Sequence, residues 1–337
     1  MLIIRNKAYA RAGFLGNPSD GYHGKTISFI VKNFSAEVVL YEWDQVEIVL
    51  ADQDRGKFRS VHDLANDVKL HGYYGGIRLI KATIKGFVEY CEKHNIKLHS
   101  QNFSIRYSSD IPRQVGLAGS SSIIVATLRC LMDFYDVHIP IEVQPSFVLS
   151  IEQDELGISA GLQDRVIQVY EGLVYMDFDQ SLEKNIKGYQ CYDYSRLDTG
   201  LLPNIYIAYH DGLSEPTEVY HNDIRGRFLR GEKKVTDAMK RFATIAFEGK
   251  QALIENDTKR LYELIDENFD LRRSISKLPD WQVQMVEEAR RCGASAKFAG
   301  SGGAIVGTYS GQKMLDKLTK KLSSIGVRTI IPIVNQD

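Results

Sequence analysis

The sequence predicts an α+β protein built from two domains. At 337 residues the chain is too long for one ordinary hydrophobic core. Patterns typical of strands alternate with long amphipathic helical patterns in both halves. Between the halves, over about residues 180–200, the sequence is polar and poorly periodic. We therefore place a first domain at residues 1–190 and a second at residues 191–337.

The first half opens with patterns typical of strands and turns. A cluster of turn residues lies between β-rich segments in RAGFLGNPSDGYHGKTISFIV. Two further strands are predicted by AEVVLYEW and VEIVLA. An amphipathic helix is predicted by GYYGGIRLIKATIKGFVEYCEKH, and a strand by NFSIRYSSDIP. A serine-rich loop, an apolar helix and another helix over about residues 146–156 complete this half.

The second half begins with a strand, NIYIAYH. Two long helical patterns follow, in EKKVTDAMKRFATIAFEGKQALIEND and TKRLYELIDENFDLRRSI. The segment SAKFAGSGGAIVGTYS then predicts a strand, a glycine loop and a second strand, and VRTIIPIV predicts a closing strand.

The composition narrows the class of protein. A hydrophobic content of 44% and a charged content of 25% are typical of a globular protein. The net charge of −1 argues against a nucleic-acid-binding protein, and the basic segment at residues 225–234 is better interpreted as a solvated helix face. No apolar run approaches the roughly 18 residues of a membrane span, and the first residues show no secretory pattern. We expect a cytoplasmic protein without a nucleic-acid or membrane partner.

The cysteines support a reducing compartment. They are far apart and form no pair with metal-binding spacing. Two of them lie within apolar helical patterns, as buried thiols do. We expect all four to be reduced: Cys91, Cys130, Cys191 and Cys292.

The serine-rich loop, IPRQVGLAGSSSIIV at residues 111–125, contains the most informative local pattern. Glycines and three consecutive serines lie directly before a run of aliphatic residues. Serine at a helix start can cap the free backbone N–H groups of the first turn. Such an end can also bind an anion, because its N–H groups and its dipole favour negative charge. Two interpretations therefore stay open, an ordinary cap and a phosphate cradle.

Standard nucleotide-binding motifs do not match. Gly24 precedes Lys25 and Thr26 as in a P-loop, but Ser19 stands where that motif needs its first glycine. Gly300 opens a partial dinucleotide-binding motif, but Ile305 stands where its last glycine belongs. The protein-kinase signatures H-R-D and D-F-G are absent from the sequence.

Three segments instead resemble, in order and spacing, the GHMP kinases, the small-molecule kinases named for galactokinase, homoserine kinase, mevalonate kinase and phosphomevalonate kinase. They are AYARAGFLGNPSD, the serine loop and KFAGSGGAIVG. The serine loop has one residue more than the family's G-L-G-S-S-A, and GNPSD stands where the sugar kinases have G-E-H-x-D. The glucuronokinase branch shares both departures, and it is also similar in GYYGGIRL and LMDFYDV.

The resemblance implies a fold and an activity. The expected fold has an N-terminal domain like ribosomal protein S5 and a C-terminal ferredoxin-like domain. The expected reaction is ATP- and Mg²⁺-dependent phosphorylation of the anomeric hydroxyl of glucuronic acid, by a monomer or a homodimer. Three alternatives remain: a kinase for a heptose, galactose or arabinose derivative, an inactive sensor that binds sugar and ATP, and a scaffold in which the loops are only caps and turns.

The resemblance also assigns ATP and metal contacts. Ser121 matches the serine that binds Mg²⁺, and Glu152 matches the carboxylate of that metal site, a donor set that suits this ion. Without the serine loop, Glu152 would be interpreted as a surface glutamate. The positions matching the ATP-phosphate loops are Gly116, Leu117, Ala118, Gly119, Ser120, Ser121, Ser122, Gly300, Gly302 and Gly303.

Asp164 matches the catalytic base of the family, and Arg11 matches the cation beside it. Arg11 would keep Asp164 ionised or polarise the sugar hydroxyl. Two structural interpretations compete with these roles. Asp164 precedes an apolar stretch, as a helix-capping aspartate does, and Arg11 could be a charge on a strand surface.

The sugar contacts are less specific. Asp20 matches a residue that binds a sugar hydroxyl in the sugar kinases. Tyr22, Tyr73 and Tyr74 could line a sugar or adenine pocket, although aromatic residues more often pack in a core. A uronic acid also needs a partner for its carboxylate, and arginine is the natural one. The two candidates for that role are Arg113 and Arg225.

Overall fold

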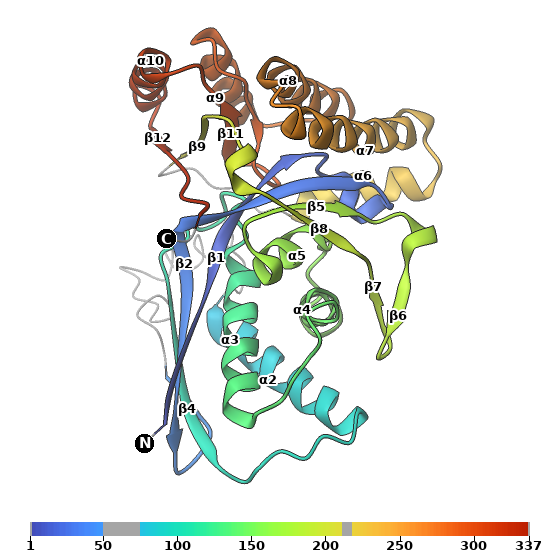
Figure 1. The fold of residues 1–337 in the computed structure, drawn as a ribbon, viewed down its shortest axis with the longest axis vertical. Helices are drawn as coiled ribbons and strands as arrows, with labels where there is room; N and C mark the ends of the chain where they lie inside the picture. Colours follow the sequence, from blue (N-terminus) through green and yellow to red (C-terminus); the bar gives the residue numbers. More distant parts are fainter. Residues whose placement is uncertain (1, 50–74, 211–217, 336–337) are drawn as a thin grey trace, which may run out of the picture.

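The computed structural model describes residues 2–49, 75–210 and 218–335. The first half forms a six-stranded sheet of order β3-β4-β2-β5-β8, in which β1 also pairs with β2. Figure 1 shows β1 and β2 as the long strands of this sheet. Its strands are β1 (Ile3–Leu15), β2 (Lys25–Trp43), β3 (Glu47–Ile48), β4 (Asn102–Ser109), β5 (Leu173–Asp177) and β8 (Tyr194–Leu197).

Strand β2 joins two predicted strands into one. Its first part pairs with β5, from Lys25 to Phe29, and its second part pairs with β4, from Ala36 to Trp43. Strand β1 runs antiparallel along both parts and shifts its register between Tyr9 and Ala10. The polar residues between the two apolar runs therefore lie within a continuous strand, because pairing with a long neighbour supplies their hydrogen bonds.

The second half contributes a four-stranded sheet of order β10-β11-β9-β12. Its strands are β9 (Ile205–His210), β10 (Lys297–Phe298), β11 (Ala304–Thr308) and β12 (Val327–Ile330). The first sheet therefore ends at Leu197 and the second begins at Ile205, while the division placed at residue 190 falls inside a hairpin of β6 (Lys184–Ile186) and β7 (Tyr189–Cys191). Strands of three or four residues are too short to show an alternating pattern, so the sequence indicated only a polar stretch there.

The predicted helices of the first half are present and gather on one face of the six-stranded sheet (Figure 1). Helix α3 packs directly on β1 and β2, and α2 packs on α3. The helix expected over residues 146–156 begins earlier and changes to a π-helical turn. These helices are α2 (Gly76–Lys93), α3 (Gly119–Tyr135), α4 (Gln144–Ser150) with its π-helical continuation η3 (Ile151–Glu155), and α5 (Gln163–Tyr170).

The helices of the second half reach back onto the first sheet. Helix α7 packs on β2 and on the end of β1, where a Cβ atom at Gly249 would lie 2.2 Å from Cδ1 of Leu15. The largest hydrophobic cluster consequently contains residues of both halves, for example Phe29 and Val306. These helices are α6 (Glu218–Leu229), α7 (Lys233–Ile254), α8 (Thr258–Ile275), α9 (Asp280–Arg291) and α10 (Gln312–Ser323).

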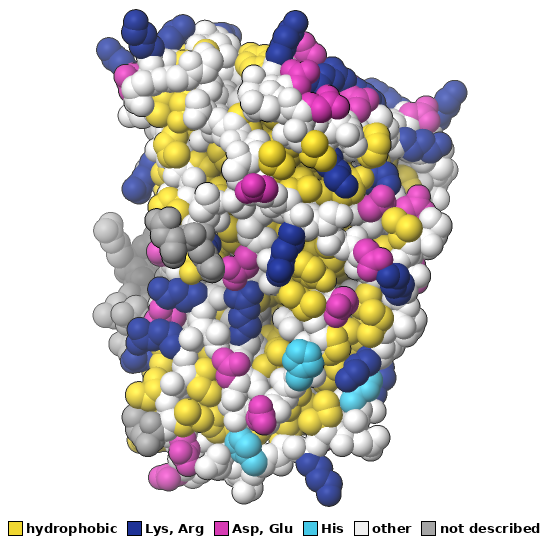
Figure 2. Space-filling view, in the orientation of Figure 1, with side chains coloured by type: hydrophobic (Ala, Val, Ile, Leu, Met, Phe, Trp, Pro, Cys, Tyr) yellow, Lys and Arg dark blue, Asp and Glu magenta, His cyan; other side chains and the backbone are white. Residues whose placement is uncertain are grey.

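The surface and the cysteines agree with the composition. Figure 2 shows basic and acidic side chains interspersed over the visible face, without an extended basic stripe. Among the described residues, no helix is long and apolar enough to cross a membrane. The four cysteines are buried and free, so the expectation of reduced core thiols is confirmed.

Candidate active site

The serine loop does not cap helix α3 with its serines. The helix begins at Gly119, its N-cap is Ala118 in the left-handed conformation, and this cap makes no side-chain hydrogen bond to the first turn. Ser121 and Ser122 lie within that turn, and each hydroxyl donates to the carbonyl of Ala118, at 3.3 and 2.9 Å. Serines in the first turn make such backward bonds. The ordinary-cap interpretation is therefore wrong, and no side-chain acceptor for the N–H groups of this turn lies among the described residues.

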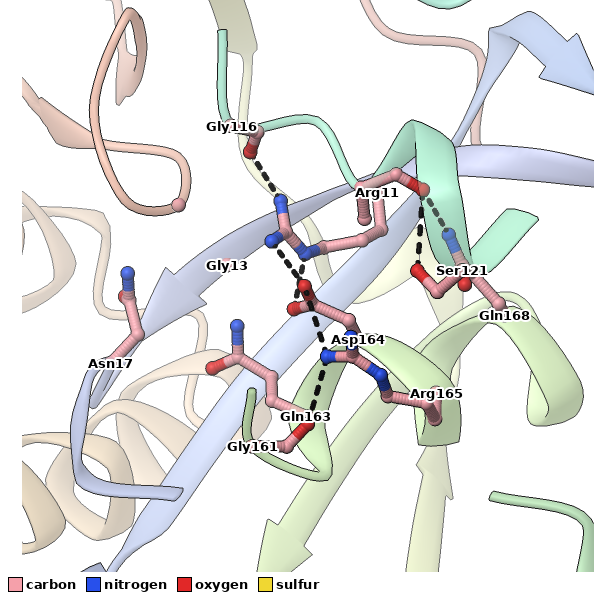
Figure 3. Close-up of polar contacts among 12 residues, drawn as sticks. Arg11, Gly13, Asn17, Gly116, Ser121, Gly161, Gln163, Asp164, Arg165 and Gln168 are labelled. Atoms are coloured by element: carbon pink, nitrogen blue, oxygen red, sulfur yellow. Dashed lines mark hydrogen bonds and ion pairs between the residues drawn. The ribbon is translucent and has the colours of Figure 1, made fainter. Parts of the chain in front are cut away.

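The loop conformation is fixed from both sides. Its backbone has positive φ at alternate residues, Gln114, Gly116 and Ala118. Gln168, which lies on α5 (Figure 3), donates from its Nε2 to the Ala118 carbonyl at 2.8 Å and to Ser122 Oγ at 2.7 Å. Alternating backbone conformations of this kind turn N–H groups toward one point, as anion-binding loops do.

The glycine loop at residues 300–303 lies against the serine loop. A Cβ atom at Gly300 would lie 2.3 Å from the Gly116 carbonyl oxygen, and one at Gly303 would lie 2.7 Å from Cα of Val115. The carbonyls of Gly300 and Ser301 accept hydrogen bonds from the Arg272 guanidinium, at 2.8 and 2.7 Å. Only glycine permits so close an approach of two backbones.

Arg11 and Asp164 form the centre of the site (Figure 3). The arginine lies on β1 and is 4% exposed. Its Nε and Nη2 donate to the two carboxylate oxygens of Asp164, at 2.6 and 2.7 Å, and its Nη1 donates to the Gly116 carbonyl at 2.5 Å. Asp164 lies in the first turn of α5 and does not cap that helix. The capping role for Asp164 and the surface position for Arg11 are therefore both wrong.

Glu152 is fully buried on η3, so it is not a surface glutamate. Its carboxylate accepts a hydrogen bond from Arg165 Nε at 2.5 Å and a second close contact from the same guanidinium. Ser120 Oγ donates to the other carboxylate oxygen at 3.1 Å. Burial raises the pKa of Glu152, and the charge of Arg165 opposes that rise.

The serine beside Glu152 differs from the expectation. Ser121, expected from the resemblance to share a metal ion with Glu152, instead turns its hydroxyl back to Ala118. Ser120 is the residue whose hydroxyl faces the carboxylate. The reason is helical geometry, since adjacent residues of one turn point about 100° apart.

Asp20 lies close to the same centre. Its Oδ2 accepts a hydrogen bond from the backbone N–H of Gln163 at 3.3 Å, and it would lie 2.0 Å from a Cβ atom at Gly161. Burial, followed by the nearby charge of Asp164, raises the pKa of Asp20 to about 6.

The other expected sugar contacts differ in their exposure. Tyr22 packs its ring 4.7 Å from that of Phe228 on α6, and burial raises the pKa of Tyr22 to about 12. Arg113 and Arg225 are exposed. Tyr73 and Tyr74 lie outside the described residues.

Sequence reasoning missed several buried polar residues around the site. Gln163 and Arg165 flank Asp164 in GLQDRV. Their position next to the expected base could have indicated that they belong to the site. Lys297 and Arg272 carry no local signal, because a charged residue on a short strand or a helix is usually exposed. Both are buried here.

The comparisons with known proteins now decide the family. The model of the GHMP kinases N terminal domain matches residues 78–172, and that of the GHMP kinases C terminal domain matches residues 250–324. The chain is 45% identical over 310 residues to Glucuronokinase 1 of Arabidopsis thaliana, which covers 90% of this chain and 84% of that protein. The chain belongs to the GHMP kinases.

More distant GHMP relatives agree with this assignment. The D-glycero-alpha-D-manno-heptose 7-phosphate kinase of Campylobacter jejuni is 21% identical over 82% of this chain and 79% of its own. The structure of Lactococcus lactis galactokinase complexed with galactose superposes with a TM-score of 0.81 over 98% of this chain and 93% of its own, at 13% identity. The latter similarity shows the fold alone. The predicted α+β fold of two GHMP domains is thus confirmed.

Proposed function

We propose that this GHMP kinase phosphorylates the anomeric hydroxyl of glucuronic acid with ATP and Mg²⁺. One observation supports the reaction above all others. The Arg11 guanidinium holds the carboxylate of Asp164 in a two-pronged ion pair and at the same time donates to the serine loop. Arg11 therefore holds a proton acceptor, Asp164, next to the serine loop, whose N–H groups can bind the phosphates. The similarity to Glucuronokinase 1 supports glucuronic acid as the substrate.

The reaction assigns a task to each part. The anomeric oxygen attacks the γ-phosphorus of ATP. The bond between that phosphorus and the β–γ bridging oxygen breaks, ADP leaves, and the hydroxyl proton passes to Asp164. Arg11 favours the ionised form of Asp164 until that transfer. The N–H groups at the start of α3 and the glycines at residues 300–303 hold the phosphates. Asp20 accepts a hydrogen bond from another sugar hydroxyl.

The residues around Glu152 suit a magnesium ion. One carboxylate and one hydroxyl are hard oxygen donors, and Mg²⁺ in kinases takes its remaining ligands from nucleotide phosphates and water. We assign the hydroxyl to Ser120 in place of Ser121, because Ser120 contacts Glu152. When bound, the ion would neutralise charge on the phosphates. Arg165 already fixes the carboxylate in one orientation.

The proposal includes a cytoplasmic enzyme. Four free, buried cysteines support that location, because cytosolic proteins keep their thiols reduced. In the alternative of an inactive sensor, one of the catalytic groups is commonly lost. Asp164, Glu152 and Arg11 are all present and buried or paired as a working site needs.

A substrate panel tests the proposal. Purified protein is supplied with ATP, Mg²⁺ and, in parallel, glucuronic acid, galacturonic acid, glucose, galactose or mannose, and ADP release is measured. Phosphorus NMR of the product establishes whether the phosphate is on the anomeric carbon. We expect turnover with glucuronic acid and a 1-phosphate product. Turnover confined to a neutral sugar would refute glucuronic acid as the substrate. The absence of turnover with every sugar would refute the proposed kinase activity.

A further inference from the structure

Lys297 is a buried lysine with no acidic partner in the part of the chain that the structure describes. It lies on β10 and is 1% exposed. Its ammonium donates three hydrogen bonds, to the Gly13 carbonyl at 2.7 Å, to Asn17 Oδ1 at 2.5 Å and to the Phe298 carbonyl at 2.8 Å. All three acceptors are uncharged. Burial, and next the nearby charges of Arg272 and Arg11, lower the pKa of Lys297 well below its usual value, whereas three acceptors for three N–H groups stabilise the ammonium form. In that form, with no carboxylate among its described contacts, the side chain makes the local potential positive.

This ammonium fixes the orientation of the Asn17 amide. An ammonium has donors only, so the oxygen of the amide must face it and Nδ2 must point away. The Asn17 backbone is held too, because its carbonyl accepts a hydrogen bond from Asn268 at 3.1 Å. Asn17 is 4% exposed and lies just beyond the end of the strand that carries Arg11. Its Nδ2 is therefore a positioned donor, polarised by the charge behind it.

Gln163 presents the complementary group. It is 3% exposed, and among the described residues its Oε1 has no hydrogen-bond partner. A Cβ atom at Gly13 would lie 2.9 Å from Gln163 Nε2 and 3.2 Å from Asn17 Cγ, so the two amides meet on either side of that glycine. Figure 3 shows both amides beside Gly13, next to the Arg11–Asp164 pair. A buried acceptor without a partner is costly unless a ligand supplies the donor.

We propose that the Asn17 amide, backed by Lys297, binds the carboxylate of the acidic sugar, and that Gln163 Oε1 accepts a hydrogen bond from one of its hydroxyls. This inference rests on the proposed function and names the group that selects a uronic acid. The position of Asn17 carries glutamate in the G-E-H-x-D motif of the sugar kinases. A glutamate would cancel the charge of Lys297 and repel a carboxylate, whereas asparagine leaves that charge available and supplies an N–H donor.

The variant Asn17→Asp tests the inference with almost no change in shape. Its carboxylate would pair with Lys297 and repel a uronate. We expect the KM for glucuronic acid to rise about 100-fold or more, as for loss of a charge-assisted contact plus repulsion. The KM for glucose, measured at high concentration, should fall or stay the same. The midpoint temperature of unfolding should rise through the new ion pair, which also verifies the fold.

Three further variants complete the experiment. Gln163→Met should raise the KM for both sugars by about tenfold, because it removes an acceptor without changing charge. Arg225→Gln tests the competing candidate for the carboxylate and should leave the ratio of the two KM values unchanged. The matched control is Lys240→Gln, at an exposed position of α7, which should leave that ratio unchanged as well. If Arg225→Gln changes that ratio and Asn17→Asp does not, the carboxylate is bound elsewhere and the inference is overturned. If the unaltered protein fails to phosphorylate glucuronic acid, the proposed function itself is overturned.

Discussion

Asp20 provides a quantitative test of the site, because its surroundings disfavour the ionised form of its carboxyl group. Burial and the neighbouring Asp164 raise the pKa of Asp20 from 3.8 to about 6. The unfolded chain releases this proton near pH 4, while the native protein retains it to about pH 6. The free energy of unfolding therefore falls as the pH rises through this window, and the loss is complete above it.

The magnitude follows from the shift. At about 1.4 kcal/mol per pH unit, ionised Asp20 costs the native state up to about 3 kcal/mol at pH 8. Asp20→Asn removes this cost and keeps an oxygen that can accept the Gln163 N–H. We expect the variant to be more stable by up to about 3 kcal/mol at pH 8 and by about 1.5 kcal/mol at pH 5, where part of the cost is absent.

Urea unfolding at several pH values between 5 and 8 measures this difference. Asp237→Asn, at an exposed position of α7, is the matched control and should change stability by less than about 0.5 kcal/mol. The gain in Asp20→Asn should come with a higher KM for the sugar, since functional sites hold groups that destabilise the fold. The reasoning is refuted if Asp20→Asn is no more stable at pH 8, or if its gain does not shrink on acidification.

Other variants test the remaining parts of the site. Asp164→Asn should lower turnover by roughly 10²–10⁴-fold with ATP affinity retained, as measured by nucleotide titration, and near-normal turnover would remove Asp164 from the proton transfer. Ser120→Ala should raise the Mg²⁺ concentration needed for half-maximal turnover more than Ser121→Ala does; a larger effect at Ser121 would reverse our assignment. Gly300→Ala, which forces the two loops apart, should lower turnover at least about tenfold. Gly21→Ala is the control: no atom lies within 4 Å of the new Cβ, so turnover should stay unchanged.

The sequence predicted the elements whose apolar pattern is long and local. The helices at residues 76–93 and 233–254 and the strand–loop–strand around Gly300 are examples. It did not predict that one strand would cover residues 25–43, because continuity there comes from pairing with β1. Nor did it indicate that the short polar stretch near residue 190 would hold three strands.

The sequence predicted the site residues whose chemical type indicates their role. It did not predict the residues that reach the site only through the three-dimensional fold. Asp164 and Arg11 were expected together, and their contact is observed. The partner of Glu152 was expected to be Ser121, but helix rotation presents Ser120. Lys297 was not expected, since its burial depends on three acceptors, two of which lie far away in the chain.

The contact between Gly249 and Leu15 determines how this fold can be recombined. Helix α7 lies so close to β1 that a single methyl group would be 2.2 Å from the leucine side chain. A chimera that joins the first 200 residues of this chain to the last part of a distant relative must therefore match both surfaces of this joint. A partner with a larger side chain at this position would require the buried Leu15 side chain to move. A chimera therefore folds best when the residues facing Gly249 and Leu15 are exchanged together.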